Sequence, residues 1–268
     1  MSTTYTLTRS GSPDPVELTV DEVGTGRPFL LLHGGAGPVS FLSFAAYLAE
    51  HRPARALVPT NPGFNGTPRP AGLADVRGLA DLYVALLDRL DLRGVTVVGN
   101  SIGGWVAAEI AILASPRVTG VVIMNGTGIA VPGHPVADFF ALSLDELADL
   151  SYDDPARFRI DPAGLSAGQK AVMGANREAI ALYAGRDMTD PTLAARLAAV
   201  TVPTLVLWGQ SDRVVDPDYG RAYAAAIPGA RYQPLDRTGH LPQLETPALA
   251  LGPIWDFADE HAARPAAG

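Results

Sequence analysis

The chain has 268 residues, of which 47% are hydrophobic and 18% are charged, a composition typical of a globular protein with a large buried core. A formal net charge of −8 disfavours nucleic acids and anionic membrane surfaces as partners, because both repel an acidic protein. The absence of cysteine excludes disulfides, thiolate catalysis and cysteine-ligated metals. Residues 1–15 lack the layout of a signal peptide, and no apolar run approaches the roughly 20 residues that span a bilayer, so we expect a cytoplasmic protein.

Short apolar runs rich in β-branched residues alternate with longer amphipathic segments along most of the chain. This alternation predicts an α/β fold in which helices cover both faces of a mostly parallel sheet. Strands are predicted at residues 5–8, 16–23, 29–32, 56–58, 95–98, 118–124, 204–208 and 231–235. Helices are predicted at residues 41–50, 73–90, 102–114, 219–226 and 248–262.

One interval, residues 126–200, breaks this alternation. It contains amphipathic stretches such as 138–150 and 168–184, and the run Thr-Asp-Pro-Thr at 189–192 is typical of a helix start. We therefore expect a helical cap at residues 127–200, inserted into an α/β core formed by residues 1–126 and 201–268. Two extra packing helices with no role in substrate access are the alternative.

A candidate nucleophile lies between the strand at 95–98 and the following helix. The connecting segment 99–104 reads Gly-Asn-Ser-Ile-Gly-Gly and places Ser101 in a sharp strand-to-helix turn. Such a turn needs small neighbours, and it exposes the serine hydroxyl at the edge of the sheet. It also brings the Ile102 amide to a helix N-terminus, where it can stabilise negative charge.

An activated serine needs a base, and the base needs an acid that orients it. His240 follows a late strand within a glycine turn, whereas His51, His134 and His261 lie in polar or terminal segments. Asp212 comes just after the strand at 204–208, where open α/β sheets place their chemistry.

The competing acid is Asp216, whose place directly before Pro217 instead predicts a helix cap. The strand before offers no acid at its end, because that position is Asn125. The order Ser101, Asp212, His240 is the nucleophile–acid–base order of hydrolases with this turn.

A second source of backbone donors is the segment His33-Gly34-Gly35-Ala36, which ends an early strand. A tetrahedral oxyanion needs two preorganised N–H donors, and we predict the amides of Ile102 and Gly35, with Ala36 as the alternative to Gly35. The segment lacks the spacing of phosphate-binding and dinucleotide-binding loops. His33 is expected to brace the loop through hydrogen bonds.

These segments, together with Asn-Pro-Gly-Phe at 61–64, Trp-Gly-Gln-Ser-Asp-Arg at 208–213 and Gly-His-Leu-Pro-Gln-Leu-Glu at 239–245, resemble the α/β-hydrolase superfamily over residues 16–258. The resemblance implies an eight-stranded, mostly parallel sheet with a helical cap after the sixth strand. Its members with an aspartate nucleophile, the haloalkane dehalogenases and epoxide hydrolases, do not fit Ser101.

The Gly-Asn-Ser turn at 99–101 and the His-Gly-Gly loop at 33–35 are also similar to those of carbon–carbon bond hydrolases that act on ring-cleavage diketones. That resemblance marks Asn100 as a candidate substrate contact and Arg177 as a counterpart of the cap arginine that binds the substrate's carboxylate. The sequence departs from those enzymes after the catalytic histidine, where Leu241 replaces a tryptophan.

Three hypotheses follow. The first is a carboxylesterase-like serine hydrolase that cleaves an ester or similarly activated carbonyl of a small apolar substrate through an acyl-enzyme, with no metal or organic cofactor. The second is a carbon–carbon bond hydrolase of ring-cleavage diketones. The third is a non-catalytic ligand-binding protein with the same fold, whose signature would be a lost triad or oxyanion residue; none is lost here. The partner in each case is a small molecule. The sequence does not decide whether the protein forms a homodimer.

Overall fold

The structure, a computed structural model, describes residues 1–10, 12 and 14–262 and contains one eight-stranded sheet. The strand order is β1-β2-β4-β3-β5-β6-β7-β8, with antiparallel pairing of β1 with β2 and of β2 with β4 and parallel pairing elsewhere. The strands are β1 (Ser2–Thr8), β2 (Pro15–Gly24), β3 (Arg27–Leu32), β4 (Ala54–Pro59), β5 (Val95–Asn100), β6 (Val118–Met124), β7 (Thr204–Gly209) and β8 (Arg231–Leu235). The predicted fold class, including the mostly parallel sheet, is therefore confirmed.

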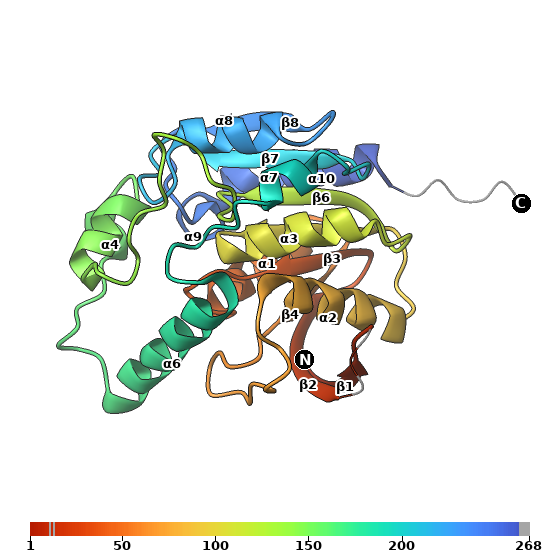
Figure 1. Ribbon diagram of the computed structural model, residues 1–268, viewed down its shortest axis with the longest axis horizontal. Helices are drawn as coiled ribbons and strands as arrows, with labels where there is room; N and C mark the ends of the chain where they lie inside the picture. Colours follow the sequence, from red (N-terminus) through yellow and green to blue (C-terminus); the bar gives the residue numbers. More distant parts are fainter. Residues whose placement is uncertain (11, 13, 263–268) are drawn as a thin grey trace, which may run out of the picture.

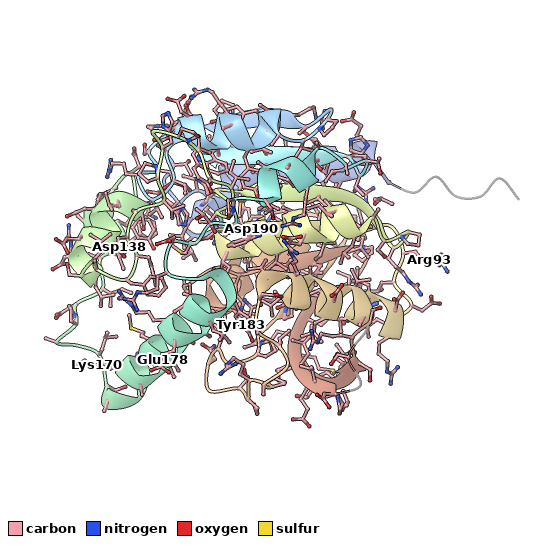
Figure 2. The ribbon with its side chains drawn as sticks, viewed as in Figure 1. Arg93, Asp138, Lys170, Glu178, Tyr183 and Asp190 are labelled. Atoms are coloured by element: carbon pink, nitrogen blue, oxygen red, sulfur yellow. The ribbon has the colours of Figure 1, made fainter. Side chains whose placement is uncertain are left out.

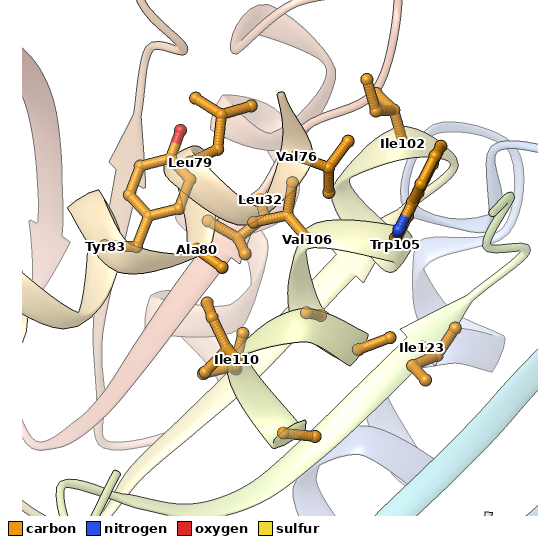
Figure 3. Packing of buried hydrophobic residues seen from close by; sticks show 14 of the residues in the cluster. Leu32, Val76, Leu79, Ala80, Tyr83, Ile102, Trp105, Val106, Ile110 and Ile123 are labelled. Atoms are coloured by element: carbon orange, nitrogen blue, oxygen red, sulfur yellow. The ribbon is translucent and has the colours of Figure 1, made fainter. Parts of the chain in front are cut away.

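The central strands bury both faces because their side chains alternate between two separate cores. In β3, Leu30 and Leu32 belong to the core beneath α2 (Val76–Arg89), α3 (Ile102–Leu113) and α8 (Pro217–Ala225), part of which Figure 3 shows. Phe29 and Leu31 instead belong to the core beneath α1 (Val39–His51) and α10 (Pro247–Glu260). The sheet is thus the middle of three layers, and its carboxyl edge is left for the loops that follow β3, β5, β7 and β8.

The insertion between β6 and β7 contains α4 (Leu144–Ser151), α5 (Pro155–Phe158), α6 (Ala167–Ala184) and α7 (Leu193–Leu197). Figure 1 shows α4 and α6 together at one end of the molecule, whereas α7 packs against α3. Tyr183 lies at the end of α6 nearest the sheet and Lys170 near its outer end (Figure 2). The Tyr183 hydroxyl donates to the Pro62 carbonyl at 2.8 Å, which fastens the inner end of α6 to the loop after β4.

Two predicted helices begin later than the apolar pattern indicates. The helix predicted at 73–90 begins at Val76, because the Asp75 side chain caps it by accepting from the Gly78 amide at 2.8 Å. The stretch predicted at 138–150 becomes α4 only from Leu144, where Ser143 and Glu146 form a reciprocal capping box. Asp138 instead accepts from the amides of Phe140 and Ala141 and makes a turn.

None of the helices in the described part of the chain combines the length and the apolar character needed to span a bilayer.

Candidate active site

Ser101 occupies the turn between β5 and α3 in a backbone conformation that few residues other than glycine adopt. Its φ is 58° and its ψ is −123°, and such strain is typical of the turn that presents a hydrolase nucleophile. The Ser101 amide donates to the Met124 carbonyl at 3.1 Å, which fixes the turn to the neighbouring strand β6. The helix then begins at Ile102, so positive helix-end charge lies directly beside the hydroxyl.

His240 and Asp212 form a hydrogen-bonded pair. His240 Nδ1 lies 2.8 Å from Asp212 Oδ2, with Asp212 1% exposed and His240 6% exposed. An Nδ1–H that donates to the carboxylate leaves Nε2 as the proton acceptor, which is the tautomer a general base needs. Ser101 and His240 line the same cavity.

Asn125 supports the Asp212 carboxylate, a role that the sequence analysis missed. Its Nδ2 donates to Asp212 Oδ2 at 2.7 Å, and its Oδ1 accepts from the Gly209 amide. The Val214 amide donates to Asp212 Oδ1 at 2.8 Å, so both carboxylate oxygens are held. The sequence signal for this role was a polar residue directly after β6, at the position where an acid at a strand end was expected.

The competing acid Asp216 lies in a different cluster. Its Oδ1 accepts from the Tyr219 amide at 2.9 Å and caps α8, as its position before Pro217 predicts. Its Oδ2 lies 2.7 Å from His134 Nδ1, and that hydrogen bond raises the pKa of His134. Asp218 completes this cluster, with one oxygen bound to Arg221.

The loop after β3 passes directly against Ser101. A Cβ on Gly34 would lie 2.8 Å from the Cβ of Ser101, so only glycine permits this approach. The amides of Gly35 and Ile102 belong to residues that line the same cavity as Ser101, and neither amide donates a hydrogen bond to another described residue. Ala36 also lines the cavity.

His33 braces this loop from inside. Its Nδ1 donates to the Gly34 carbonyl at 2.8 Å, while its Nε2 accepts from the Asn61 amide at 3.1 Å. Complete burial lowers the pKa of His33 from 6.5 to about 4, so its imidazole is neutral at pH 7. A neutral ring is what this pair of hydrogen bonds requires, because one nitrogen donates and the other accepts.

Asn100, the candidate substrate contact, is 1% exposed and has its amide bound to the protein. Its Nδ2 donates to the carbonyls of His240 at 2.8 Å and Met124 at 3.1 Å. Its Oδ1 accepts from Gln243 Nε2 at 3.0 Å. In this structure Asn100 therefore joins the turn at Ser101 to the loop that contains His240.

The cavity at the site has a volume of about 440 Å³ and lies between the sheet edge and the inserted helices. Its walls are mainly apolar and include Leu147 of α4, Ile180 of α6 and Phe139 of the loop before α4. Arg177 is the one arginine among the described residues that line it, and no aspartate or glutamate does so. The guanidinium lies over the Phe139 ring at 4.8 Å and donates to the Phe139 carbonyl at 2.6 Å, so its position is fixed.

Comparisons with known proteins agree with this architecture. The chain is 28% identical to a 2-hydroxy-6-oxo-2,4-heptadienoate hydrolase of Pseudomonas putida F1 over 86% of this chain and 88% of that protein. It is 27% identical to a 2-hydroxymuconate semialdehyde hydrolase of Pseudomonas sp. CF600 over 91% of each chain. Among solved structures, a thermophilic esterase from Thermogutta terrifontis shares the fold with a TM-score of 0.77 at 24% identity, over 97% of this chain and 100% of the esterase.

A meta-cleavage product hydrolase from Pseudomonas fluorescens IP01 also shares the fold, with a TM-score of 0.74 at 20% identity over 96% of this chain and 97% of that one. The sequence profile of the alpha/beta hydrolase family matches residues 29–251, most of the chain. The chain thus belongs to the alpha/beta hydrolase family and is a hydrolase.

Proposed function

We propose that the protein is a serine hydrolase that cleaves an ester or similarly activated carbonyl with Ser101 as nucleophile. The observation that carries the proposal is the 2.8 Å hydrogen bond from His240 Nδ1 to buried Asp212, with His240 lining the cavity that also contains Ser101. This arrangement supplies a nucleophile, a base and an orienting acid in one place.

The reaction follows from the roles of these groups. Ser101 Oγ attacks the carbonyl carbon while His240 Nε2 takes the hydroxyl proton, and the oxyanion accepts hydrogen bonds from the Gly35 and Ile102 amides. As the carbonyl reforms, the proton passes from Nε2 to the departing alcohol. Water then attacks the acyl-enzyme carbonyl while His240 Nε2 takes a proton from the water. That proton passes to Ser101 Oγ as the acid departs, which regenerates the enzyme.

The cavity indicates the size and polarity of the substrate. A volume of about 440 Å³ with mainly apolar walls accommodates a small or medium apolar acyl group. We infer that residues 127–200 act as the cap that selects this group, because just over half of the residues that line the cavity belong to this segment.

A matched pair of variants tests the assignment of the acid. Asp212→Asn should lower kcat for p-nitrophenyl butyrate by about 10⁴-fold, because the imidazole loses the partner that orients it. Asp216→Asn removes the charge but keeps an oxygen that can cap α8, because asparagine caps a helix about as well as aspartate, so kcat should stay close to the wild-type value with little loss of stability. Near-normal turnover by folded Asp212→Asn would rule out this triad.

Carbon–carbon bond hydrolysis of ring-cleavage diketones is the second candidate. Arg177 favours it, because a fixed cation suits a substrate that carries a carboxylate, and none of the described residues that line the cavity is an aspartate or a glutamate. The curated relatives named above act on dienoates and semialdehydes of this kind. The same triad would first ketonise the dienol and then hydrolyse the bond between two carbons.

Kinetics on two substrate classes separate the candidates. A panel of short p-nitrophenyl esters is assayed beside 2-hydroxy-6-oxohepta-2,4-dienoate, with wild type and Arg177→Gln. Carbon–carbon hydrolysis predicts turnover of the dienoate and a rise in its KM in Arg177→Gln that is much larger than the rise for a neutral ester. Strong ester turnover with an untouched dienoate would eliminate the second candidate.

A further inference from the structure

The C-terminal end of α4 is an unusual helix end, because its carbonyls accept hydrogen bonds from the two loops that carry the proposed acid and base. The last carbonyls of a helix have no partner within the helix and must find donors elsewhere. α4 ends at Ser151, and the next residue, Tyr152, is extended. The carbonyls of Asp149, Leu150 and Ser151 therefore depend on donors from outside the helix.

The acid loop supplies the first set of donors through Arg213, the residue directly after Asp212. The Arg213 amide donates to the Leu150 carbonyl at 3.0 Å. Its guanidinium donates to the Asp149 carbonyl through Nε at 3.1 Å and to the Tyr152 carbonyl through Nη2 at 3.3 Å. A cation at the negative end of a helix is also favoured electrostatically.

The base loop supplies the second set. The His240 amide donates to the Ser151 carbonyl at 2.6 Å, so the backbone of the proposed base is bound to the last residue of α4. Glu245 adds a bridge, because its Oε2 accepts from the Gly239 amide at 2.5 Å and its Oε1 accepts from the Asp153 amide at 2.7 Å. Figure 1 shows α4 at the same end of the molecule as α9 (Pro242–Glu245), which carries Glu245.

We propose that the end of α4 sets the relative position of the Asp212 and His240 loops, and that Arg213 and Glu245 are the positioning residues that fasten it. This inference rests on the proposed triad. α4 also lines the cavity with Leu144, Leu147 and Ala148. A ligand that fills the cavity and contacts α4 therefore contacts the helix that holds the acid and base loops. Binding of a ligand in the cavity is thereby linked to the geometry of the triad.

The test measures how fast a fluorophosphonate labels Ser101, with the maximum labelling rate separated from the apparent affinity of the reagent. Arg213→Ala should lower the maximum rate by on the order of 10-fold to 10²-fold, because a small displacement of the base is costly, with little change in apparent affinity. Arg213→Lys, which can still donate to one carbonyl, should recover part of the rate. The matched control is Arg159→Ala, since Arg159 pairs with the carboxylates of Asp145 and Asp149 on the same helix.

The outcomes separate the two proposals. An unlabelled wild-type protein removes the proposed triad itself, whereas a labelled wild type with Arg213→Ala as fast as Arg159→Ala overturns the positioning role. If Arg213→Ala does not fold, Glu245→Gln decides, because its amide would set an NH₂ group against the Gly239 or Asp153 N–H. A slower maximum rate in Glu245→Gln supports the positioning role, and a wild-type rate overturns it.

Discussion

Gly103 shows how a single residue determines whether the turn at Ser101 can form. A Cβ at this position would lie 2.1 Å from the Leu32 carbonyl oxygen and 2.8 Å from that of His33. Both are backbone atoms, so no side-chain rearrangement can relieve the contact. Glycine at 103 is what lets the first turn of α3 cross the end of β3.

We therefore expect Gly103→Ala to lower the free energy of unfolding by at least about 3 kcal/mol, as severe overpacking does, and to abolish activity. The control is Gly174→Ala in the interior of α6, where a new Cβ would have no atom within 4 Å. This change should raise stability by about 0.5–1 kcal/mol, because alanine favours the helix more than glycine does. Urea denaturation measures both, and equal stability of the two variants would contradict this explanation.

His33 makes the stability of the protein depend on pH. The pKa of His33 is 6.5 before burial and about 4 in the folded protein, so the unfolded chain binds the proton more readily. The stabilisation is fully present above pH 6.5 and is lost as pH falls from 6.5 towards 4, by on the order of 3 kcal/mol.

The comparison is with His33→Gln, which cannot take up a proton. The difference in free energy of unfolding, wild type minus variant, should fall by about 3 kcal/mol between pH 7 and pH 4. Denaturant titrations at a series of pH values measure it. A difference that stays constant over this range would show that His33 is not the buried neutral histidine described here.

Some residues of the site could be predicted from sequence because each follows a strand end, where position alone indicates chemistry. The role of Asn125 could not be predicted. Its amide at a strand end indicates only that no acid is present there, and its function becomes clear only from its hydrogen bond to Asp212. The same holds for Gln243, which reaches Asn100 across 143 positions of sequence. Contacts between distant loops leave no local pattern.

At the scale of elements, a partly buried ion pair joins α3 to α7. Glu109 in α3 has a side chain that is 5% exposed and accepts from both terminal nitrogens of Arg196, at 2.5 and 2.7 Å. Arg196 also binds Asp190, which lies beside α3 in Figure 2. Helix α3 is thereby fastened to the segment that returns from the inserted helices to the core.

Arg196→Met should lower the free energy of unfolding by about 3 kcal/mol, because it leaves the Glu109 carboxylate buried without its main partner. The double variant Glu109→Met, Arg196→Met removes both charges and should recover most of this loss. Chemical denaturation of the two variants and of wild type measures these free energies of unfolding. A single variant within about 0.5 kcal/mol of wild type, the range of an ordinary surface change, would mean that the pair contributes little.

The type and approximate place of most helices and strands were predictable from the sequence, whereas the first residue of a helix was harder to predict. Apolar periodicity identifies the buried face of a helix, but the cap decides where the helix begins. The 138–150 stretch illustrates this, because Asp138 forms a turn and the Ser143 capping box starts α4 six residues later. The short helices α5 and α9 carry no periodic pattern of their own and were not predicted.

At the scale of the whole molecule, the parallel sheet brings together loops that are far apart in sequence. Ser101, Asp212 and His240 follow β5, β7 and β8, and the loop with Gly35 follows β3. This convergence was predictable because parallel strands end at one edge. The cavity walls were not, since α4 and α6 are amphipathic helices in which the sequence does not distinguish residues that line the cavity from residues that fill the interior.

The most direct test of the proposed nucleophile is reaction of the whole protein with a fluorophosphonate, followed by mass spectrometry of the labelled peptide. Wild-type protein should carry one adduct on Ser101, and Ser101→Ala should carry none. His240→Ala should react far more slowly, because no base remains to take the proton from Oγ. Wild-type protein that stays unlabelled, or that is labelled at another serine, would contradict Ser101 as the nucleophile of this hydrolase.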